Sequence, residues 1–300
     1  MLYQNCRPSH WREVVGNTDT VKYLEAAVEN PNRPHAYLMQ GPSGSGKTTL
    51  ARIFAKELGC SGSDLTEVDV GDYRGIDSVR EIRQAMNLRP MVSSCRVWIL
   101  DECQKLTGDA QSALLKALED APKYSYFILA TTDPQKLLNT IINRCTPCPV
   151  KTLTETEMEK VLLRAARSVK FKLSREAIDS LIEVSNGTPR AALVALEKHI
   201  ANPEAAIEDL SEASKEIKDL CQVLMKKQSW KAVANVLLLL KGKTSEEDVR
   251  RAVLGYAAAI RMKGSDDPQA LVILDIFKDP FYNSGWSGLV WACSLAVQKS

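Results

Sequence analysis

The sequence of 300 residues has no long apolar run, no low-complexity segment and no repeat at a fixed period. Its longest apolar run, VLLLL at residues 236–240, is far too short for a bilayer, which a helix crosses with about 20 residues. The opening MLYQNCRPSHWREVV has no apolar stretch behind a basic start and does not fit a secretory signal. We therefore expect a cytoplasmic protein without a membrane partner.

Histidine is scarce and cysteine is scattered, which argues against a structural zinc site. The three histidines are far apart, and Cys145 and Cys148 are the only close pair among eight cysteines. A common zinc site needs a second close pair or histidines at short spacing. We expect no zinc, and we expect reduced thiols rather than disulfides. The segment IINRCTPCPV leaves three interpretations open: a metal-binding turn, a redox pair, or a motif whose functional residue is Arg144.

The charge balance excludes little. Lys and Arg total 39, Asp and Glu total 37, and the formal net charge is +2. A nucleic-acid binder can still gather its basic residues on one face, so the total neither requires nor forbids such a partner. The length exceeds that of one compact core and predicts two or three domains.

Short apolar runs alternate with helical patterns in the first half of the chain. Four runs predict strands at 36–40, 65–70, 95–100 and 126–130, and a fifth strand is predicted at 148–153. Near-continuous apolar strands separated by helices predict a parallel sheet with helices on both faces. We assign this α/β domain to residues 1–153.

Strand signals stop after residue 153, and a small domain of three short helices is predicted at 154–206. Thr154 with Glu157 three residues later forms a capping-box pattern, which predicts a helix start. A second helix is expected to follow Ser174, and a third to begin at Pro189, a favoured residue at the first helical position.

A third, all-helical domain is predicted at 207–300. In SEEDVRRAVLGYAAAIRMKG the apolar residues step by four, three and four, which places them on one helix face. They are Val249, Val253, Tyr256 and Ile260. The function of this domain does not follow from the pattern.

The stretch GPSGSGKT, residues 41–48, fits the phosphate-loop pattern G-x-x-x-x-G-K-[ST] and lies between a predicted strand and a predicted helix. Glycines let the backbone wrap around phosphates, and the helix N-terminus offers free N–H groups. Lys47 is expected to reach the β and γ phosphates, and the Thr48 hydroxyl to help hold Mg²⁺. The predicted nucleotide-binding residues here are Gly41, Pro42, Ser43, Gly44, Ser45, Gly46, Lys47, Thr48 and Thr49.

An acidic pair follows the third predicted strand in RVWILDEC. Asp101 is expected to orient Mg²⁺, and Glu102 to activate the attacking water as a general base. An ordinary acidic strand end is the bland alternative, but its pairing with a phosphate loop favours an NTPase site.

Six ordered motifs between about residues 7 and 193 resemble those of sliding-clamp loader ATPases, both bacterial tau/gamma subunits and small subunits of replication factor C. They are RPSHWREVVGN, HAYLMQGPSGSGKTTLARIFAKELGC, RGIDSVREIR, DECQKLTGDAQSALLKALEDAP, FILATTDPQKLLNTIINRC and NGTPRAAL. The resemblance implies an AAA+ P-loop sheet, a three-helix lid and a helical C-terminal collar. It further implies an ATP- and Mg²⁺-dependent ATPase in a homo- or hetero-pentameric ring, acting with a sliding clamp and primer-template DNA.

The resemblance also implies roles for individual residues. Arg144 matches the arginine finger of a Ser-Arg-Cys motif, which acts on a neighbouring subunit's ATP, although Asn143 replaces the serine. Thr132 matches the sensor 1 position, with Thr131 as a competing choice. Arg190 matches sensor 2, and Val15 joins the nucleotide-binding residues.

Arg190 has an independent physical signal as well. If Thr188 caps the helix, Arg190 lies in the first turn, where the helix dipole disfavours a cation. A residue that breaks a local rule is a candidate for function. A surface arginine is the alternative.

DNA contacts are expected in the helices at 75–87 and 107–120, as the resemblance implies. Arg80 and Arg83 share a helix face and can reach phosphates. The helix N-terminus at Thr107 and Gly108 can offer N–H groups. The alternative is a solvated face neutralised by Asp77 and Glu81.

Two departures from the tau/gamma pattern are visible. GCSGSDLTEVDV keeps only Cys60 where those subunits carry a four-cysteine zinc module, and we expect no long C-terminal extension of the tau kind. The chain fits a compact cellular subunit near the nucleoid, or a phage-encoded one in the host cytoplasm. Two rival functions remain: a non-hydrolysing structural subunit of a loader, and another AAA+ DNA motor such as a branch-migration helicase.

Overall fold

The chain forms two compact units, Met1–Ile200 and Ala201–Ser300. The computed structural model describes residues 1–71, 75–202, 215–262, 264, 266–279, 281 and 285–298. The predicted boundary at 206/207 lies outside these residues. The predicted boundary at 153/154 falls inside the first unit and remains a prediction.

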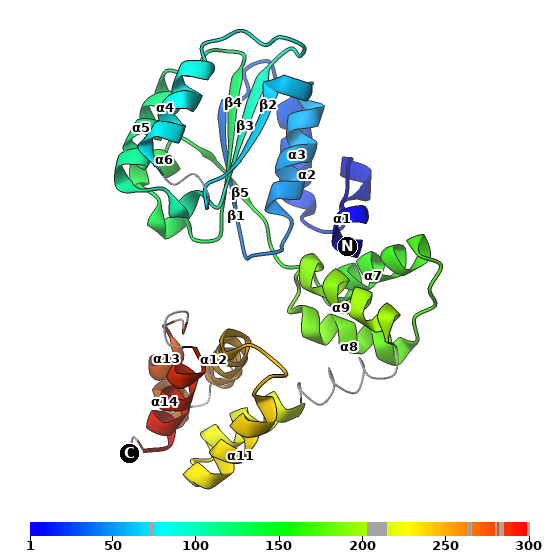
Figure 1. Cartoon of the computed structure of the whole chain (residues 1–300), viewed down its shortest axis with the longest axis vertical. Coiled ribbons are helices and arrows are strands. Elements are labelled where there is room, and N and C mark those ends of the chain that lie inside the picture. The colour runs from blue at the N-terminus through cyan, green and yellow to red at the C-terminus, as the bar shows by residue number, and fades with distance from the viewer. Residues whose placement is uncertain are drawn as a thin grey trace. The chain divides into compact units, whose positions relative to one another are not determined.

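The first unit contains a five-stranded parallel sheet in the order β2-β3-β4-β1-β5 (Figure 1). This confirms the predicted α/β class. Four strands lie within a residue of their predicted positions. The strands are β1 Ala36–Gln40, β2 Leu65–Asp69, β3 Arg96–Asp101, β4 Ser125–Thr131 and β5 Thr146–Pro149.

The fifth strand begins two residues earlier than predicted and ends four residues earlier, so the expectation of 148–153 was wrong. Its two prolines, Pro147 and Pro149, hid the strand from the apolar pattern. Strand β5 pairs only with β1 and forms an edge of the sheet, where proline is tolerated. After Val150 the chain leaves the sheet, and the Lys151 amide donates to the Asn17 side chain instead (2.7 Å).

Helices cover both faces of the sheet, α2 and α3 on one side and α4, α5 and α6 on the other (Figure 1). Alternate residues of β1 explain why. Tyr37 and Met39 pack in one core cluster, whereas Ala36 and Leu38 pack in the other. The helices are α1 Leu2–Asn5, α2 Thr18–Glu29, α3 Lys47–Glu57, α4 Ile76–Ala85, α5 Gly108–Glu119 and α6 Asn139–Ile142.

Three helices follow the sheet: α7 Glu155–Ser168, α8 Arg175–Ser185 and α9 Pro189–Ala201. Their predicted starts are confirmed. Thr154 and Glu157 form the reciprocal capping box, and the Ser174 hydroxyl accepts the Ala177 amide (3.1 Å). The Thr188 hydroxyl donates to the Ser185 carbonyl (2.9 Å), which ties the start of α9 to the end of α8.

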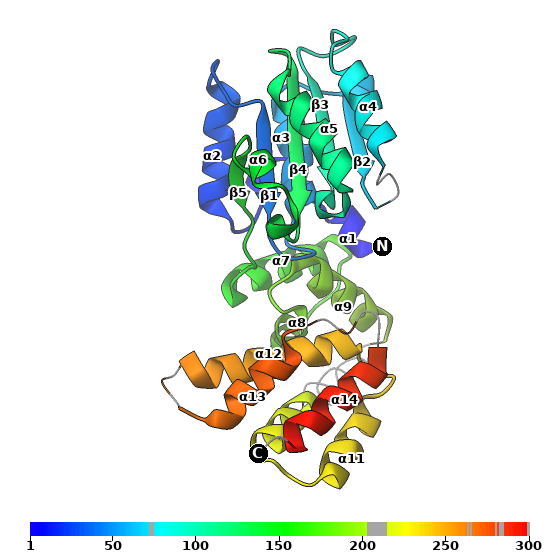
Figure 2. The same cartoon turned by 90° about the vertical axis from the view of Figure 1, so that its left-hand side faces the viewer.

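The described part of the second unit is helical and has its own core. Residues 215–225 form a helix, followed by α11 Trp230–Leu240, α12 Glu246–Met262, α13 Pro268–Phe277 and α14 Gly285–Gln298. Helices α12 and α13 lie side by side (Figure 2). The predicted stripe on α12 faces this core, with Val249 and Val253 buried. Among the described residues, no helix is long and apolar enough to cross a membrane.

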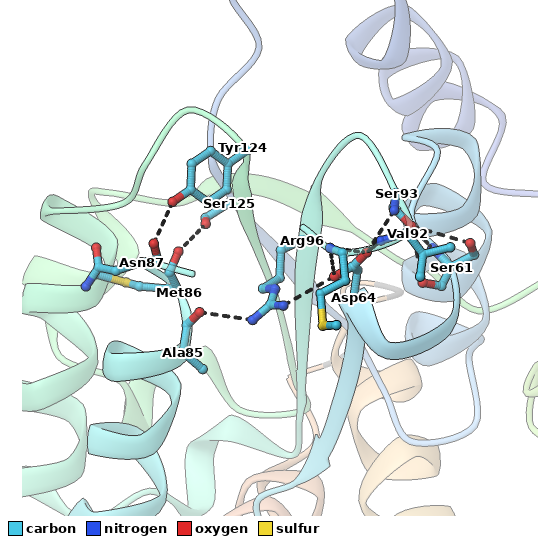
Figure 3. A network of polar contacts seen from close by, with 11 residues as sticks. Ser61, Asp64, Ala85, Met86, Asn87, Val92, Ser93, Arg96, Tyr124 and Ser125 are labelled. Carbon is cyan, nitrogen blue, oxygen red and sulfur yellow. Dashed lines mark hydrogen bonds and ion pairs between the residues drawn. The ribbon is translucent and has the colours of Figure 1, made fainter. Parts of the chain in front are cut away.

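A buried carboxylate organises the edge of the sheet where β3 and β4 begin (Figure 3). Asp64, just before β2, is fully buried. It accepts the backbone amides of Met91, Val92 and Ser93 at 2.8–2.9 Å and pairs with Arg96 at 3.3 Å. The Met91 amide is the main cause that holds the Asp64 pKa far below its usual range, and the other amides and Arg96 act in the same direction.

The same network fixes both ends of the segment between α4 and β3. Arg96 donates to the Ala85 carbonyl at the end of α4 (3.1 Å). Ser125 donates to the Met86 carbonyl (2.9 Å), and Tyr124 donates to the Asn87 carbonyl (2.8 Å). The backbone of this segment is therefore held at both ends by side chains from three strands or their flanks (Figure 3).

We predict that Asp64→Asn lowers the thermal unfolding temperature at pH 7, because an amide offers one acceptor oxygen and turns its N–H₂ toward backbone donors. A lowered folded-state pKa means that the carboxylate stabilises the fold above its unfolded pKa of about 4, and that this contribution is lost as pH falls further. The difference in unfolding temperature between the wild type and Asp64→Asn should therefore shrink below about pH 4. Calorimetry from pH 7 to pH 3 measures it.

Asp179→Asn is the control, because Asp179 pairs with Arg175 on the exposed surface and such pairs contribute little. A constant gap between wild type and Asp64→Asn over the whole pH range would contradict the role assigned to the carboxylate.

Candidate nucleotide-binding site

The loop between β1 and α3 has a backbone that only glycine permits at key positions. A Cβ on Gly41 would lie 2.0 Å from the Val150 carbonyl oxygen. Gly44 and Gly46 have φ of +74° and +109°, in the left-handed region that favours glycine. The loop thus turns tightly over the end of β1 and delivers the chain into α3 with its N–H groups exposed at the loop.

Lys47, the first residue of α3, is buried under this loop. Its Nζ donates to the carbonyls of Gly41 and Pro42, both at 2.9 Å. Burial lowers the Lys47 pKa, while the nearby carboxylates of Glu102 and Asp101 act against that shift. The ammonium is held among loop carbonyls, where phosphate oxygens can take over as acceptors.

Thr48 and Asp101 meet across the carboxyl edge of the sheet. The Thr48 hydroxyl donates to Asp101 Oδ2 at 2.6 Å, and the Glu102 amide donates to Oδ1 at 2.9 Å. A hydroxyl and a carboxylate are hard oxygen ligands of the kind that suits Mg²⁺ beside a nucleotide phosphate. The donor set therefore fits the predicted ion, which Thr48 and Asp101 would hold.

Glu102 and Thr132 are joined by Gln104, which sequence reasoning did not single out. Gln104 Nε2 donates to Glu102 Oε2 (2.6 Å) and to Thr132 Oγ1 (2.9 Å). Glu102 lines the pocket beside the phosphate loop, whereas Thr132 is not among the described lining residues. Thr131, the competing choice, is fully buried and donates to Gln104 Oε1 (2.8 Å).

Arg190 approaches the phosphate loop from the start of α9. Its amide donates to the Gly44 carbonyl (3.4 Å), and its guanidinium lies 6.0 Å from the centre of the Tyr3 ring. Val15 lines the same pocket. The pocket thus brings together the predicted residues Val15, Ser43, Gly44, Ser45, Gly46, Lys47, Thr48, Thr49, Asp101, Glu102 and Arg190, whereas Gly41 and Pro42 lie beneath it and hold Lys47.

Several lining residues escaped the sequence analysis, notably Tyr3, Arg7, Asp69 and Arg164. Asp69 ends β2 directly opposite Asp101 in the sheet register. An acidic residue at the end of one strand is a signal when the neighbouring strand also ends in an acidic residue. That signal could be used only once β2 and β3 were known to be neighbours. Tyr3 and Arg164, from the N-terminal segment and α7, were marked by no local pattern, and Arg7 opens the quoted motif RPSHWREVVGN but was not singled out.

Arg144 lies away from the chain's own pocket, just after α6. Its side chain is 41% exposed, pairs with Glu119 at the end of α5 (2.5 Å), and donates to the Thr140 carbonyl (3.1 Å). The ion pair with Glu119 and the hydrogen bond to Thr140 thus hold the Arg144 guanidinium at the surface. Its role as an arginine finger remains a prediction.

Cys145 and Cys148 lie in different core clusters, on opposite faces of the sheet. Burial raises the pKa of each thiol to about 12, so both stay protonated at neutral pH. The two sulfurs therefore do not converge on one ion or form an exposed redox pair. Among the described residues, no group of three or more metal-binding side chains gathers.

The predicted DNA-contacting residues lie on α4 and α5. Arg80 is exposed and pairs with Asp77 (3.1 Å), and Arg83 pairs with Asp120 (3.5 Å). Thr107 caps α5 by accepting the Ala110 amide (3.3 Å), and Gly108 begins that helix. Contact with DNA stays a prediction for all four predicted residues.

The chain is similar in sequence to subunits of DNA polymerase III. Residues 62–154 match the family described as DNA polymerase III, delta subunit. DNA polymerase III subunit tau of Bacillus subtilis is 32% identical over 221 residues, covering 67% of this chain and 39% of that protein. Subunit gamma/tau of Mycobacterium tuberculosis is 33% identical over 223 residues, with the same two shares. The chain spans less than half the length of these relatives.

Among solved structures, the RuvB Holliday junction branch migration motor of Thermotoga maritima has a TM-score of 0.57 at 20% identity, covering 95% of this chain and 90% of that one. A variant of the same protein reaches 0.61 at 19% identity, covering 88% and 99%. At this identity the likeness shows the fold alone.

The sheet order, the phosphate loop and the acidic pair define an AAA+ nucleotide-binding protein. Within that class, the region shared with the gamma/tau subunits assigns the chain to the clamp-loader family.

We predict that Lys47→Ala weakens binding of Mg²⁺-ATP by about tenfold or more. A hydrogen bond to a charged group contributes about 1.5–3 kcal/mol, and 1.4 kcal/mol corresponds to tenfold in affinity. Titration of a fluorescent ATP analogue measures the change. Lys56→Ala, an exposed lysine of the same helix, should bind as wild type does. Equal affinity of Lys47→Ala and Lys56→Ala would contradict the placement of phosphates at the loop.

Proposed function

We propose that the chain is an ATP-hydrolysing subunit of a sliding-clamp loader. The observation that carries this proposal is the meeting of Lys47, Thr48, Asp101 and Glu102 at one pocket, in a chain whose relatives are DNA polymerase III subunits tau and gamma/tau. Such a protein would use ATP with Mg²⁺, act with other loader subunits, a clamp and primer-template DNA, and work in the cytoplasm.

Each group at the pocket has a part in ATP hydrolysis. Lys47 binds the β and γ phosphates, and Thr48 and Asp101 hold the ion that shields them. Glu102 accepts a proton from the attacking water as general base. Arg190 belongs to α9 and contacts the loop through its own backbone, so nucleotide binding and the position of the three-helix segment are linked.

Arg144 completes the reaction in a neighbouring subunit. It lies outside the described lining of its own pocket, with 41% of its side chain exposed. A planar cation at that position can stabilise charge on the transferring phosphoryl group of the next ATP. Hydrolysis then requires an assembled ring.

The second unit offers surfaces for that assembly. Its exposed apolar side chains include Leu238 and Leu239 on α11 and Trp291 on α14, each more than half exposed. Large exposed apolar side chains in a soluble domain are typical of protein interfaces. We assign them to contacts within a ring of loader subunits.

The clamp-facing surface of the first unit is the segment 88–92. Leu88, Met91 and Val92 are 61%, 80% and 73% exposed, the largest such cluster in the described part of the unit. The backbone amides of Met91 and Val92 are held by the Asp64 carboxylate, and Arg96 holds the end of α4 at Ala85, upstream of Leu88 (Figure 3). Because the framework is ordered before binding, apolar contact with a clamp costs little conformational entropy.

Two rivals are separable from this proposal. A non-hydrolysing loader subunit has no use for the phosphate-loop lysine together with the acidic pair, and this chain has both. A branch-migration motor shares the fold, but a sliding clamp would not stimulate its ATPase.

The proposal predicts that primed DNA and a cognate clamp stimulate ATP hydrolysis, and that Arg144→Ala lowers the stimulated rate by ~10³ while ATP binding is kept, since an arginine finger contributes ~10³ to 10⁵. Steady-state phosphate release on the assembled complex measures the rate. Arg175→Ala, another exposed and ion-paired arginine, is the matched control.

Absence of stimulation by any cognate clamp would overturn the loader assignment. ATP binding without turnover, even with partner subunits and DNA, would favour the structural-subunit rival. Normal ATP turnover by Arg144→Ala would overturn only the assignment of Arg144 as the arginine finger.

For the clamp surface, we predict that the double change Met91→Ser and Val92→Ser weakens clamp binding by about tenfold or more, because burying one such side chain contributes about 1.5–3 kcal/mol. The backbone amides that bind Asp64 are kept. Surface plasmon resonance with immobilised clamp measures affinity, and Val169→Ser, an exposed apolar residue after α7, is the control. Unchanged clamp affinity of the double variant would remove this segment from the interface.

A further inference from the structure

Gln104 occupies the centre of the group of side chains around Glu102. It lies in the 3₁₀ turn Cys103–Lys105, two residues after Glu102 and directly after the end of β3. Its amide makes four hydrogen bonds, which use both donors and both acceptor positions. Nε2 donates to Glu102 Oε2 (2.6 Å) and Thr132 Oγ1 (2.9 Å), and Oε1 accepts from Thr131 Oγ1 (2.8 Å) and the Thr132 amide (3.4 Å).

The chemistry of the partners fixes which way the amide points. An ionised carboxylate only accepts hydrogen bonds, so the atom facing Glu102 is the amide nitrogen. The backbone N–H of Thr132 only donates, so the atom facing it is the oxygen. Both conditions select the same orientation, and a flipped amide would lose both bonds.

Among the described residues, Gln104 makes the shortest hydrogen bond or ion pair to the Glu102 side chain. The next is Lys105 Nζ at 3.9 Å, on a side chain that is 42% exposed. The Glu102 backbone has φ of +54°, an uncommon conformation for a residue other than glycine, and its amide is held by Asp101. The main chain thus sets the direction in which the Glu102 side chain leaves the backbone, and the hydrogen bond from Gln104 sets the position of its carboxylate.

We propose that Gln104 is a positioning residue that orients the Glu102 carboxylate for proton abstraction and couples it to Thr132 at the end of β4. A change at Thr132 moves the Gln104 amide, which moves the general base. This proposal rests on the ATP hydrolysis proposed above. Gln104 itself stays out of the described lining of the pocket, so it acts through Glu102.

The test is single-turnover ATP hydrolysis by the assembled complex carrying Gln104→Leu, which removes both the donors and the acceptors. We expect the rate constant to fall about 10- to 100-fold, since small misplacement of a reacting group costs up to about 10². ATP affinity should stay within about twofold, because the phosphate-loop contacts are untouched. Gln135→Leu, an exposed glutamine in the 3₁₀ turn after β4, should keep the wild-type rate.

Two readouts separate positioning from a general structural role. In a Glu102→Ala background, Gln104→Leu should cause no further loss, because a residue that acts through Glu102 has nothing left to orient. The near-isosteric Gln104→Glu keeps the size of the side chain but replaces the amide donors by a carboxylate, which cannot donate to Glu102. Its single-turnover rate constant should therefore fall as that of Gln104→Leu does, while ATP affinity stays within about twofold. This variant also keeps the test valid if Gln104→Leu folds poorly.

Normal turnover by Gln104→Leu would overturn this proposal and leave the ATPase assignment intact. An equal loss in the Glu102→Ala background would also overturn it. A wild-type complex without hydrolysis would overturn both, because Gln104 would then have no reaction to assist.

Discussion

The hydrogen bond between Thr48 and Asp101, 2.6 Å long, is the contact on which the site depends. It joins the start of α3 to the end of β3, and β4 lies between β3 and β1 in the sheet. Only a parallel sheet brings the carboxyl ends of these three strands to one edge. The phosphate loop, the ion ligands and the group containing Gln104 and Thr132 then fall side by side, although Thr48 and Thr132 are 84 positions apart in sequence.

The polar groups at the amino ends of the parallel strands and those at their carboxyl ends are satisfied in different ways. At the edge where β3 begins, Asp64 is satisfied entirely within the protein by backbone amides and Arg96. At the carboxyl edge, Lys47 and Asp101 are satisfied by groups that a nucleotide and its ion can replace. A buried carboxylate held by several partners at once is rigid, which suits a framework under the segment proposed to contact a clamp. Partners that can be exchanged suit a site that binds and releases its ligand.

Contiguous motifs were readable from the sequence, and contacts set by strand order were not. GPSGSGKT and the DE pair after an apolar strand carry their own structural context, so their positions followed from pattern alone. Gln104 gave no signal because two of its three partners, Thr131 and Thr132, come from the end of β4, and the sequence does not say that β4 neighbours β3. The Cys145–Cys148 pair shows the converse: its close spacing left a metal-binding turn or a redox pair open, but Cys145 precedes β5 and packs on one face of the sheet, whereas Cys148 lies within β5 and packs on the other. The prediction misplaced the fifth strand because proline usually argues against a strand. An edge strand such as β5 tolerates proline.

The position of Arg144 determines what one copy of this chain can do. The described pocket brings together the proposed phosphate-binding lysine, ion ligands and base, and Arg190 approaches from α9, whereas the proposed finger Arg144 lies outside its described lining and is exposed. It is held by Glu119 at the end of α5, the helix that starts after the turn containing Gln104. The proposed base, Glu102, and Glu119, the ion-pair partner of the proposed finger, therefore stand at the two ends of residues 102–119. Under the proposed function, a shift of α5 would move Glu119 and, through this ion pair, the finger offered to the next subunit, so the stretch that begins at the base of one pocket would also position the cation for another.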